Sequence, residues 1–124
     1  MERPLTCPVN SAMLDGLTAN LERYLDLLSA RQKLVASNIA NADTPGYKTQ
    51  DIDFQFEFMS LVNGQRPQTI DAQGLKEKPD GNNVSLDREA RLLAENAMRF
   101  NVASTLLRDK IKMVQQAIQG GSGA

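Results

Sequence analysis

Apolar residues in the first third of the chain recur at the spacing of an amphipathic helix. Every seventh position from residue 14 carries an aliphatic side chain: Leu14, Leu21, Leu28 and Val35. Because 3.6 residues make one helical turn, these positions share one face, which predicts a helix over residues 11–42. Pro4 and Pro8 disfavour helical backbone before Asn10, so residues 1–10 are expected to form a flexible N-terminal segment.

A turn is expected directly after this first helix. Thr44 precedes Pro45, which disfavours helical backbone at Thr44, and Pro45-Gly46 suits the centre of a type II turn. The second central residue of such a turn has a positive φ, which glycine adopts without a steric penalty. The sequence therefore predicts a positive φ at Gly46.

A second long helix is predicted over residues 84–119, with Ser85 as its N-cap. Two rows of positions seven residues apart run along it: Leu86, Leu93, Phe100, Leu107 and Val114 in one, and Ala90, Ala97, Ser104, Ile111 and Ile118 in the other. This is an apolar seam of nearly five heptads, which is typical of a left-handed coiled coil. The glycine-rich residues 120–124 are expected to form a flexible tail.

Residues 43–83, between the helices, are predicted to form an extended connecting region that contains β-structure. Ile52, Phe54, Phe56 and Phe58 alternate with polar residues, which is the period of a strand with one buried face. A second, short strand is expected at residues 68–70.

Three carboxylates, Asp51, Asp53 and Glu57, would share the polar face of the predicted strand. Carboxylates placed together can act as general acids and bases or bind calcium. The pattern lacks both the glycine of an EF-hand loop and a second acidic cluster at ligand spacing. We therefore interpret these side chains as the solvated face of an edge strand and predict no metal site.

Together these elements predict a mainly α protein. Residues 11–42 and 84–119 would pair as an antiparallel coiled coil, a helical rod-core domain joined by the extended region. A lone pair of helices of this length leaves part of each apolar stripe exposed, so we expect other subunits to cover it.

The composition excludes several classes of function. The chain has 124 residues, no histidine, one cysteine, and 14 basic against 15 acidic side chains. Without histidine there is no Ser-His or Cys-His pair and no imidazole ligand, and Cys7 alone forms no internal disulfide. A net charge of −1 gives no basic field for nucleic acid. We therefore expect no enzymatic activity, no cofactor, no metal and no small-molecule substrate.

One motif at the end of the first predicted helix resembles a known family. The segment SNIANADTPGYK carries Asn38, Asn41, Thr44, Pro45, Gly46 and Tyr47. It closely resembles the Asn-x-x-Asn-x-x-Thr-Pro-Gly-Tyr motif of the axial proteins of the bacterial flagellum, the rod and hook group. The segments Asp51-Ile52-Asp53-Phe54 and Gly81-Asn82-Asn83-Val84 narrow the resemblance to proteins of the proximal rod.

The resemblance implies a structural subunit of the proximal rod, which forms a drive-shaft and export channel across the periplasm. It implies that the terminal helices pair and pack on neighbouring subunits, and that the asparagine-rich motif contacts other subunits. The implied partners are other copies of the chain, other proximal-rod proteins, the rod-to-membrane-ring adaptor protein, the membrane ring, and the flagellar type III export apparatus. Export would need no cleaved signal peptide, and residues 1–16 show no apolar run of the length that such a signal has.

A soluble coiled-coil adaptor or export chaperone remains an alternative from the residues alone. Such a protein would form a closed, stable dimer at low concentration, whereas a rod subunit would be a monomer that orders on assembly. Circular dichroism as a function of concentration distinguishes these two hypotheses.

Overall fold

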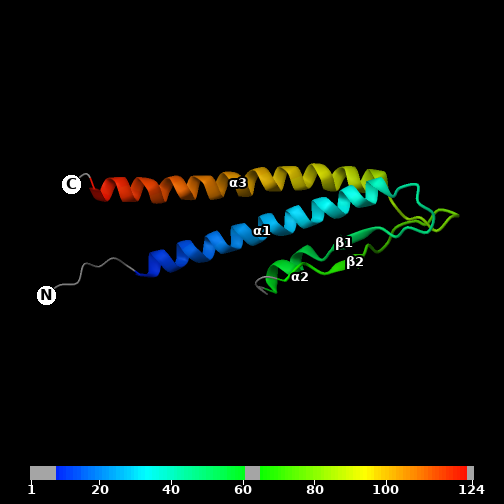
Figure 1. Cartoon of the computed structure of the whole chain (residues 1–124), viewed down its shortest axis with the longest axis horizontal. Coiled ribbons are helices and arrows are strands. Elements are labelled where there is room, and N and C mark those ends of the chain that lie inside the picture. Colours follow the sequence, from blue (N-terminus) through cyan, green and yellow to red (C-terminus); the bar gives the residue numbers. More distant parts are fainter. Residues whose placement is uncertain (1–7, 61–64, 123–124) are drawn as a thin grey trace.

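Two long antiparallel helices dominate the fold. The computed structural model describes residues 8–60 and 65–122; Cys7 and the first residues of the predicted N-terminal segment lie outside this part of the chain. The elements in chain order are α1 (Pro8–Ala40), β1 (Gln50–Ile52), α2 (Phe54–Met59), β2 (Thr69–Asp71) and α3 (Leu86–Ser122). Figure 1 shows α3 along one side of α1, with β1, β2 and α2 along the other side. The predicted mainly α fold with paired terminal helices is confirmed.

Both long helices are shifted from their expected bounds: α1 begins before residue 11 and ends before residue 42, and α3 begins after residue 84 and ends after residue 119. Residues 8–10 and 120–122, expected to be flexible, are therefore helical. α1 begins at Pro8, because a proline in the first helical turn lacks only an N–H that would have no partner within the helix. The predicted cap of α3 is confirmed, since the Ser85 Oγ accepts a hydrogen bond from the Arg88 N–H at 3.3 Å. α3 then continues through Gly120 to Ser122. In the described part of the chain, no helix is apolar enough to cross a membrane.

The predicted turn after α1 is confirmed. Gly46 has φ 74°, in the left-handed region, and its N–H donates to the Asp80 carbonyl at 2.9 Å. Gly81 has φ 85°, and a Cβ at that position would lie 3.5 Å from the Gly46 Cα. The two loops therefore cross closely at the end of the molecule where both helices meet, which we call the tip (Figure 1).

The prediction of one strand through Phe54, Phe56 and Phe58 is wrong beyond Ile52, because the chain turns there into the short helix α2. The Asp53 side chain caps this helix by accepting the Phe56 N–H at 3.0 Å. Phe54 and Phe58 lie one helical turn apart and both pack edge-on against Tyr24, with ring centroids 5.3 and 6.0 Å away. Two residues four positions apart share a face in a strand and in a helix, so this spacing alone does not distinguish the two. The Asp53 cap stabilises the helix.

The short second strand is confirmed within one residue. β2 pairs antiparallel with β1, and Asp51 lies opposite Ile70. The strand pair lies along α1, where Ile52 is buried and helps to form a small core with Leu27, Leu28, Val35 and Val84.

The helix pair is antiparallel as predicted, but α3 does not place its predicted seam against α1. The side chains of α3 that are buried at the helix pair are Glu89, Asn96, Ala103 and Lys110, which are again seven residues apart. In contrast, Leu86, Leu93 and Phe100 of the predicted seam are 57, 40 and 46% exposed, and Leu107 is half-buried. On α1, Leu28 and Val35 are buried, Leu21 is half-buried and Leu14 is exposed. α3 is therefore turned so that most of its apolar stripe faces away from its partner helix.

Candidate functional site

Asn38, near the C-terminal end of α1, is the centre of the polar contacts at the tip. Its side chain is 1% exposed, and its carboxamide nitrogen donates to the Gln50 carbonyl at 2.8 Å and to Glu89 Oε2 at 3.2 Å. Its oxygen accepts the Gln50 N–H and the Tyr47 hydroxyl, both at 3.0 Å. The amide thus bonds both backbone groups of Gln50 as a neighbouring strand would. A single side chain in this way joins α1, β1 and α3.

Asn82, which precedes α3, closes the C-terminal end of α1. It is fully buried, and its carboxamide nitrogen donates to the carbonyls of Asn41 and Thr44 at 2.9 and 2.8 Å. Asn41 directly follows α1 and Thr44 lies in the turn after it, so this one amide joins the end of α1 to the loop before α3. The Asn41 amide oxygen also accepts the Thr44 hydroxyl at 3.1 Å.

Asn83 and Thr49 complete the set of contacts. The Asn83 amide oxygen accepts the Thr49 N–H at 2.7 Å, and the Thr49 hydroxyl donates to the Asn83 carbonyl at 3.2 Å. We call Asn38, Tyr47, Thr49, Asn82 and Asn83 the polar clasp. All except the half-buried Tyr47 are buried, so the clasp fixes the two loops of the tip to both helices.

A buried charge network lies next to the polar clasp. Asp51 accepts two hydrogen bonds from the Arg31 guanidinium, both at 3.0 Å, and one from Arg88 at 2.5 Å. Arg88 also bonds Glu89 at 2.7 Å, and Glu89 is fully buried. Burial raises the pKa of Asp51, but hydrogen bonds from Arg31, the Ile52 N–H and Arg88, with the Arg31 charge, outweigh it and lower that pKa below its ordinary value.

The interpretation of Asp51, Asp53 and Glu57 as one solvated face is wrong for two of the three. Asp51 and Glu57 are each only 7% exposed, because α2 breaks the strand on which they would have shared a face. Glu57 accepts the Gln68 N–H at 3.1 Å, and the exposed Asp53 caps α2. Among the described residues, no group of three histidine, cysteine or acidic side chains could hold a metal ion.

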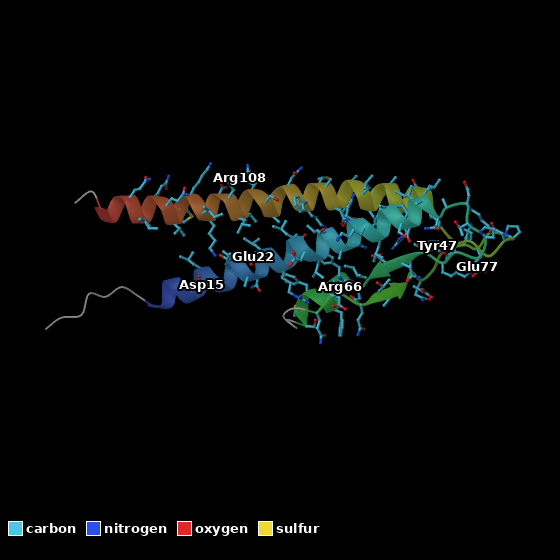
Figure 2. The ribbon with its side chains drawn as sticks, viewed as in Figure 1. Asp15, Glu22, Tyr47, Arg66, Glu77 and Arg108 are labelled. Atoms are coloured by element: carbon cyan, nitrogen blue, oxygen red, sulfur yellow. The ribbon has the colours of Figure 1, made fainter. Side chains whose placement is uncertain are left out.

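The motif residues divide between the interior and the surface of the tip. Asn38 is buried, Asn41 and Tyr47 are half-buried, and Thr44, Pro45 and Gly46 are exposed. Figure 2 places Tyr47 and Glu77 at this end of the molecule, far from the chain termini. Much of the motif therefore serves contacts within the chain, and its contact with other subunits stays a prediction.

α3 exposes apolar side chains on both sides of its contact with α1. At 100° per residue, one side carries the first flank, made up of Leu86, Leu93, Phe100, Ile111 and Ile118. The other side carries the second flank, made up of Met98, Val102, Leu106 and Met113. These side chains are between 40 and 70% exposed.

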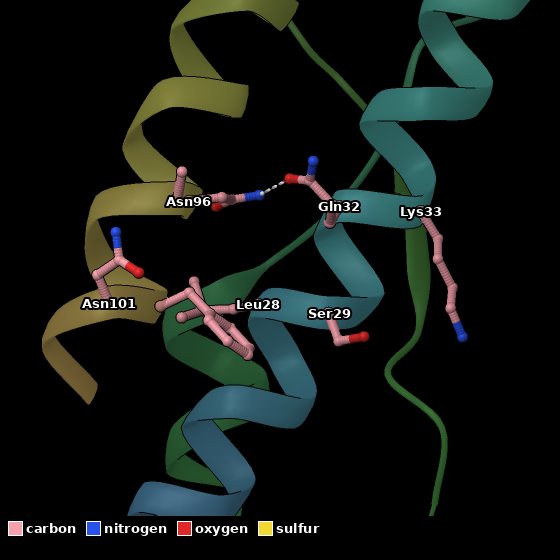
Figure 3. A pocket seen from close by; sticks show the side chains of 8 residues that line it. Leu28, Ser29, Gln32, Lys33, Asn96 and Asn101 are labelled. Carbon is pink, nitrogen blue, oxygen red and sulfur yellow. Dashed lines mark hydrogen bonds between the residues drawn. The ribbon is translucent and has the colours of Figure 1, made fainter. Parts of the chain in front are cut away.

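A groove runs along each flank. The larger, of about 600 Å³, lies between α1, α2 and α3. It is lined by Leu17, Leu21, Tyr24 and Phe58 together with Met98, Val102 and Leu106 of the second flank. The smaller, of about 370 Å³, lies between α1 and α3 beside Phe100. Figure 3 shows Asn96 and Gln32 joined across this smaller groove by their side-chain amides. Both grooves follow the helix pair, so a helix is the shape of partner that fits them.

Sequence reasoning missed the polar residues that hold these parts together. Arg31 and Arg88 carry no hydrophobic signal, and Asn82 and Asn83 stand out only within a segment that resembles the rod proteins. One signal was available, because Glu89, Asn96 and Lys110 occupy the same position of the heptad. A polar row at constant heptad spacing indicates a helix face under constraint.

Comparison with known proteins identifies a family through the segment that contains the motif. The model of the family described as flagella basal body rod protein matches residues 25–48, which include the motif. The flagellar basal body rod protein FlgB of Salmonella typhimurium is 34% identical over 89% of this chain and 100% of its own length, and that of Escherichia coli matches equally. FlgB of Borrelia hermsii is 30% identical over 78% of this chain and 91% of its own length. The resemblance found in the sequence is confirmed, and the chain belongs to the FlgB family of flagellar basal body rod proteins.

Proposed function

We propose that this chain is a structural subunit of the proximal rod of a bacterial flagellum and that it polymerises through the apolar faces of its two long helices. The observation that carries the proposal is the exposure of both flanks of α3 beside its contact with α1. Removing a Leu, Ile, Met or Phe side chain from water contributes about 1.5–3 kcal/mol, so even partial coverage of several such side chains favours association.

Two flanks on one helix favour an open polymer over a closed dimer. A twofold dimer needs one self-complementary patch, whereas a subunit in a helical array contacts different neighbours through different patches. The first and second flanks differ in side chains and in the grooves that they border. The exposed Met13, Leu14 and Leu17 of α1 extend this apolar surface toward the N-terminus.

The residues of the predicted seams have two roles in this proposal: some stabilise the subunit itself, and others contact neighbouring subunits. Leu28 and Val35 stabilise the subunit itself, since they are buried against the rest of the chain. Leu14, Leu93, Phe100 and Val114 bind neighbouring subunits. Thr44, Pro45 and Gly46 contact a subunit that lies end-on at the tip.

The proposed partners are other copies, other proximal-rod proteins, the adaptor between rod and membrane ring, and the ring itself. The proposed location is the periplasmic part of the basal body, reached through the type III export apparatus. In this role the chain forms part of the wall of an export channel and transmits torque, and it acts on no substrate.

Introducing negative charge into the first flank tests the proposal. We expect Leu93→Asp/Phe100→Asp to abolish rod assembly and motility while the chain keeps the helical circular dichroism of the wild type, because the two side chains are 40 and 46% exposed in the single chain. Thr105→Asp, on an exposed face of the same helix, is the control and should assemble normally. Normal rods in the double variant would refute assembly through this flank, and a closed, stable dimer of the purified wild type would favour an adaptor instead.

A further inference from the structure

The line along which α3 contacts α1 is unusually polar for a helix pair. Of the four side chains of α3 that are buried there, Glu89, Asn96 and Lys110 are polar and only Ala103 is apolar. Each polar member contacts a polar side chain of α1: Glu89 bonds Asn38, Asn96 bonds Gln32 at 3.3 Å, and Lys110 bonds Thr18. We call Glu89, Asn96 and Lys110 the polar line.

These contacts keep one register along most of the helix pair. From Asn96 to Lys110, fourteen residues along α3, the partner moves fourteen residues back along α1, from Gln32 to Thr18. Buried polar residues at heptad positions are known to fix register at a cost in stability. That cost is visible here, because Asn96 is 3% exposed and its Oδ1 has no hydrogen-bond partner among the described residues.

Apolar burial alone would favour a different rotation of α3. The first flank and the half-buried Leu107 form a nearly continuous apolar stripe, displaced from the polar line by less than one quarter of a turn for most of its length. Turning that stripe toward α1 would cover side chains of the first flank, which are 40–69% exposed, and release the polar line to water. The observed rotation is therefore held by the polar contacts against the preference of the hydrophobic effect.

We propose that the polar line acts as a rotational lock, which keeps the first flank of α3 turned away from α1 and available to a neighbouring subunit. The role of the flank in assembly rests on the proposed function, but the lock itself is a property of the single chain. Its firmest end is at Glu89, which Asn38 and Arg88 bond at 3.2 and 2.7 Å, and Arg88 is in turn bonded to Asp51. Asn96 and Lys110 extend the lock along the helix.

The reactivity of single cysteines in the full-length chain measures the rotation. In a Cys7→Ser background, Ala103→Cys reports the face that is now buried, and Leu93→Cys reports the stripe that is now exposed. We expect alkylation of the thiol at 103 to be at least about tenfold slower than at 93, since a buried thiol reacts only through local opening. Equal reactivity at the two positions would already contradict the structural basis of the lock.

Removal of the polar line should then reverse the order of reactivity. In Glu89→Ala/Asn96→Ala/Lys110→Ala, the thiol at 93 should become the protected one and the thiol at 103 the reactive one. The matched control, Glu95→Ala/Asn101→Ala/Lys112→Ala, changes the same residue types at exposed positions of α3 and should keep the wild-type order. An unchanged order in the first triple variant would overturn the lock.

If circular dichroism shows that the triple variant has lost its helices, Asn96→Ala/Lys110→Ala decides. A ratio of the two rates that moves at least about threefold toward reversal supports the lock, and an unchanged ratio overturns it. These measurements use the isolated chain, so they stand apart from the aspartate variants that test rod assembly. A reversed order combined with normal assembly of Leu93→Asp/Phe100→Asp would keep the lock and reject the proposed use of the flank.

Discussion

The tip and the flanks of α3 differ in the polarity and the burial of their side chains. At the tip, buried amides and ions bond one another across α1, β1 and α3, and few apolar side chains take part. Along the flanks, large apolar side chains are 40–70% exposed and contribute little to the single chain. This difference indicates that specific polar contacts fix the fold at one end, while the apolar surface of the α3 flanks is available to bind other molecules.

Loss of the Asn38 amide should have the largest effect on the single chain. Asn38→Ala removes four hydrogen bonds and leaves buried groups of Gln50 and Glu89 without that partner. We expect the free energy of unfolding, measured by urea denaturation, to fall by about 3 kcal/mol or more. Asn20→Ala, at an exposed position of the same helix, should change it by less than about 0.5 kcal/mol. Equal losses in the two variants would show that Asn38 of the polar clasp contributes no more to stability than an exposed side chain.

Asp51→Asn should rank second, because it leaves two arginines with a neutral partner. Breaking a buried ion pair costs about 3 kcal/mol or more when fully desolvated, and the partial exposure of Arg88 reduces this to about 2 kcal/mol. Asp43→Asn, at an exposed position of the tip, is the control and should be nearly neutral in urea denaturation. A loss of stability as small as that of the control would mean that the charge network does not stabilise the tip.

The same carboxylate should make stability depend on pH in a defined direction. Because the folded pKa of Asp51 lies below its ordinary value of 3.8, the ionised side chain stabilises the fold above that pH. This contribution is lost as the pH falls through the folded pKa. Urea denaturation of wild type and Asp51→Asn should therefore show a difference that is constant near neutrality and shrinks below about pH 4. A difference that grows on acidification would contradict the depressed pKa.

Substitutions of two glycines should change stability in opposite directions by about 1 kcal/mol each. Gly46→Ala places a Cβ on a residue with φ 74° at the tip and should destabilise. Gly16→Ala lies inside α1 with nothing within 4 Å of its Cβ and should stabilise by adding helix propensity. Thermal denaturation followed by circular dichroism measures both, and equal signs would contradict the turn geometry at Gly46.

The smallest effect on the single chain is expected at the flanks. Met98→Ser and Val102→Thr change side chains that are 70 and 61% exposed, and each should alter the free energy of unfolding by less than about 0.5 kcal/mol. Combined, they should weaken self-association in sedimentation velocity experiments, in contrast to the unaffected stability. A large loss of stability would mean that the flank belongs to the core of the single chain.

The sequence predicted those parts of the fold that depend on neighbouring residues. Two helices, the turn at Gly46 and the cap at Ser85 follow from local periodicity and backbone preference. The rotation of α3 could not be predicted this way, because it depends on polar pairs such as Asn38 with Glu89, 51 residues apart. The same holds for the burial of Asp51, whose arginine partners are 20 and 37 residues away. α2 was missed because Phe54 and Phe58, four residues apart, share one face in a strand and in a helix alike.

The motif shows a related limit of prediction from sequence. Its residues identified the family correctly, yet a motif alone does not say whether a side chain contacts its own chain or another. Asn38 bonds its own chain, whereas Thr44, Pro45 and Gly46 present exposed surface at the tip. The distinction required distances between segments that the sequence separates.

Electron cryomicroscopy of purified basal bodies from the native organism tests assembly through the flanks most directly. We predict density for this chain in the rod beside the membrane ring, with helices of neighbouring subunits covering both the first and the second flank of α3. A rod that lacks this chain, or one in which both flanks face open channel or solvent, would contradict the proposed assembly.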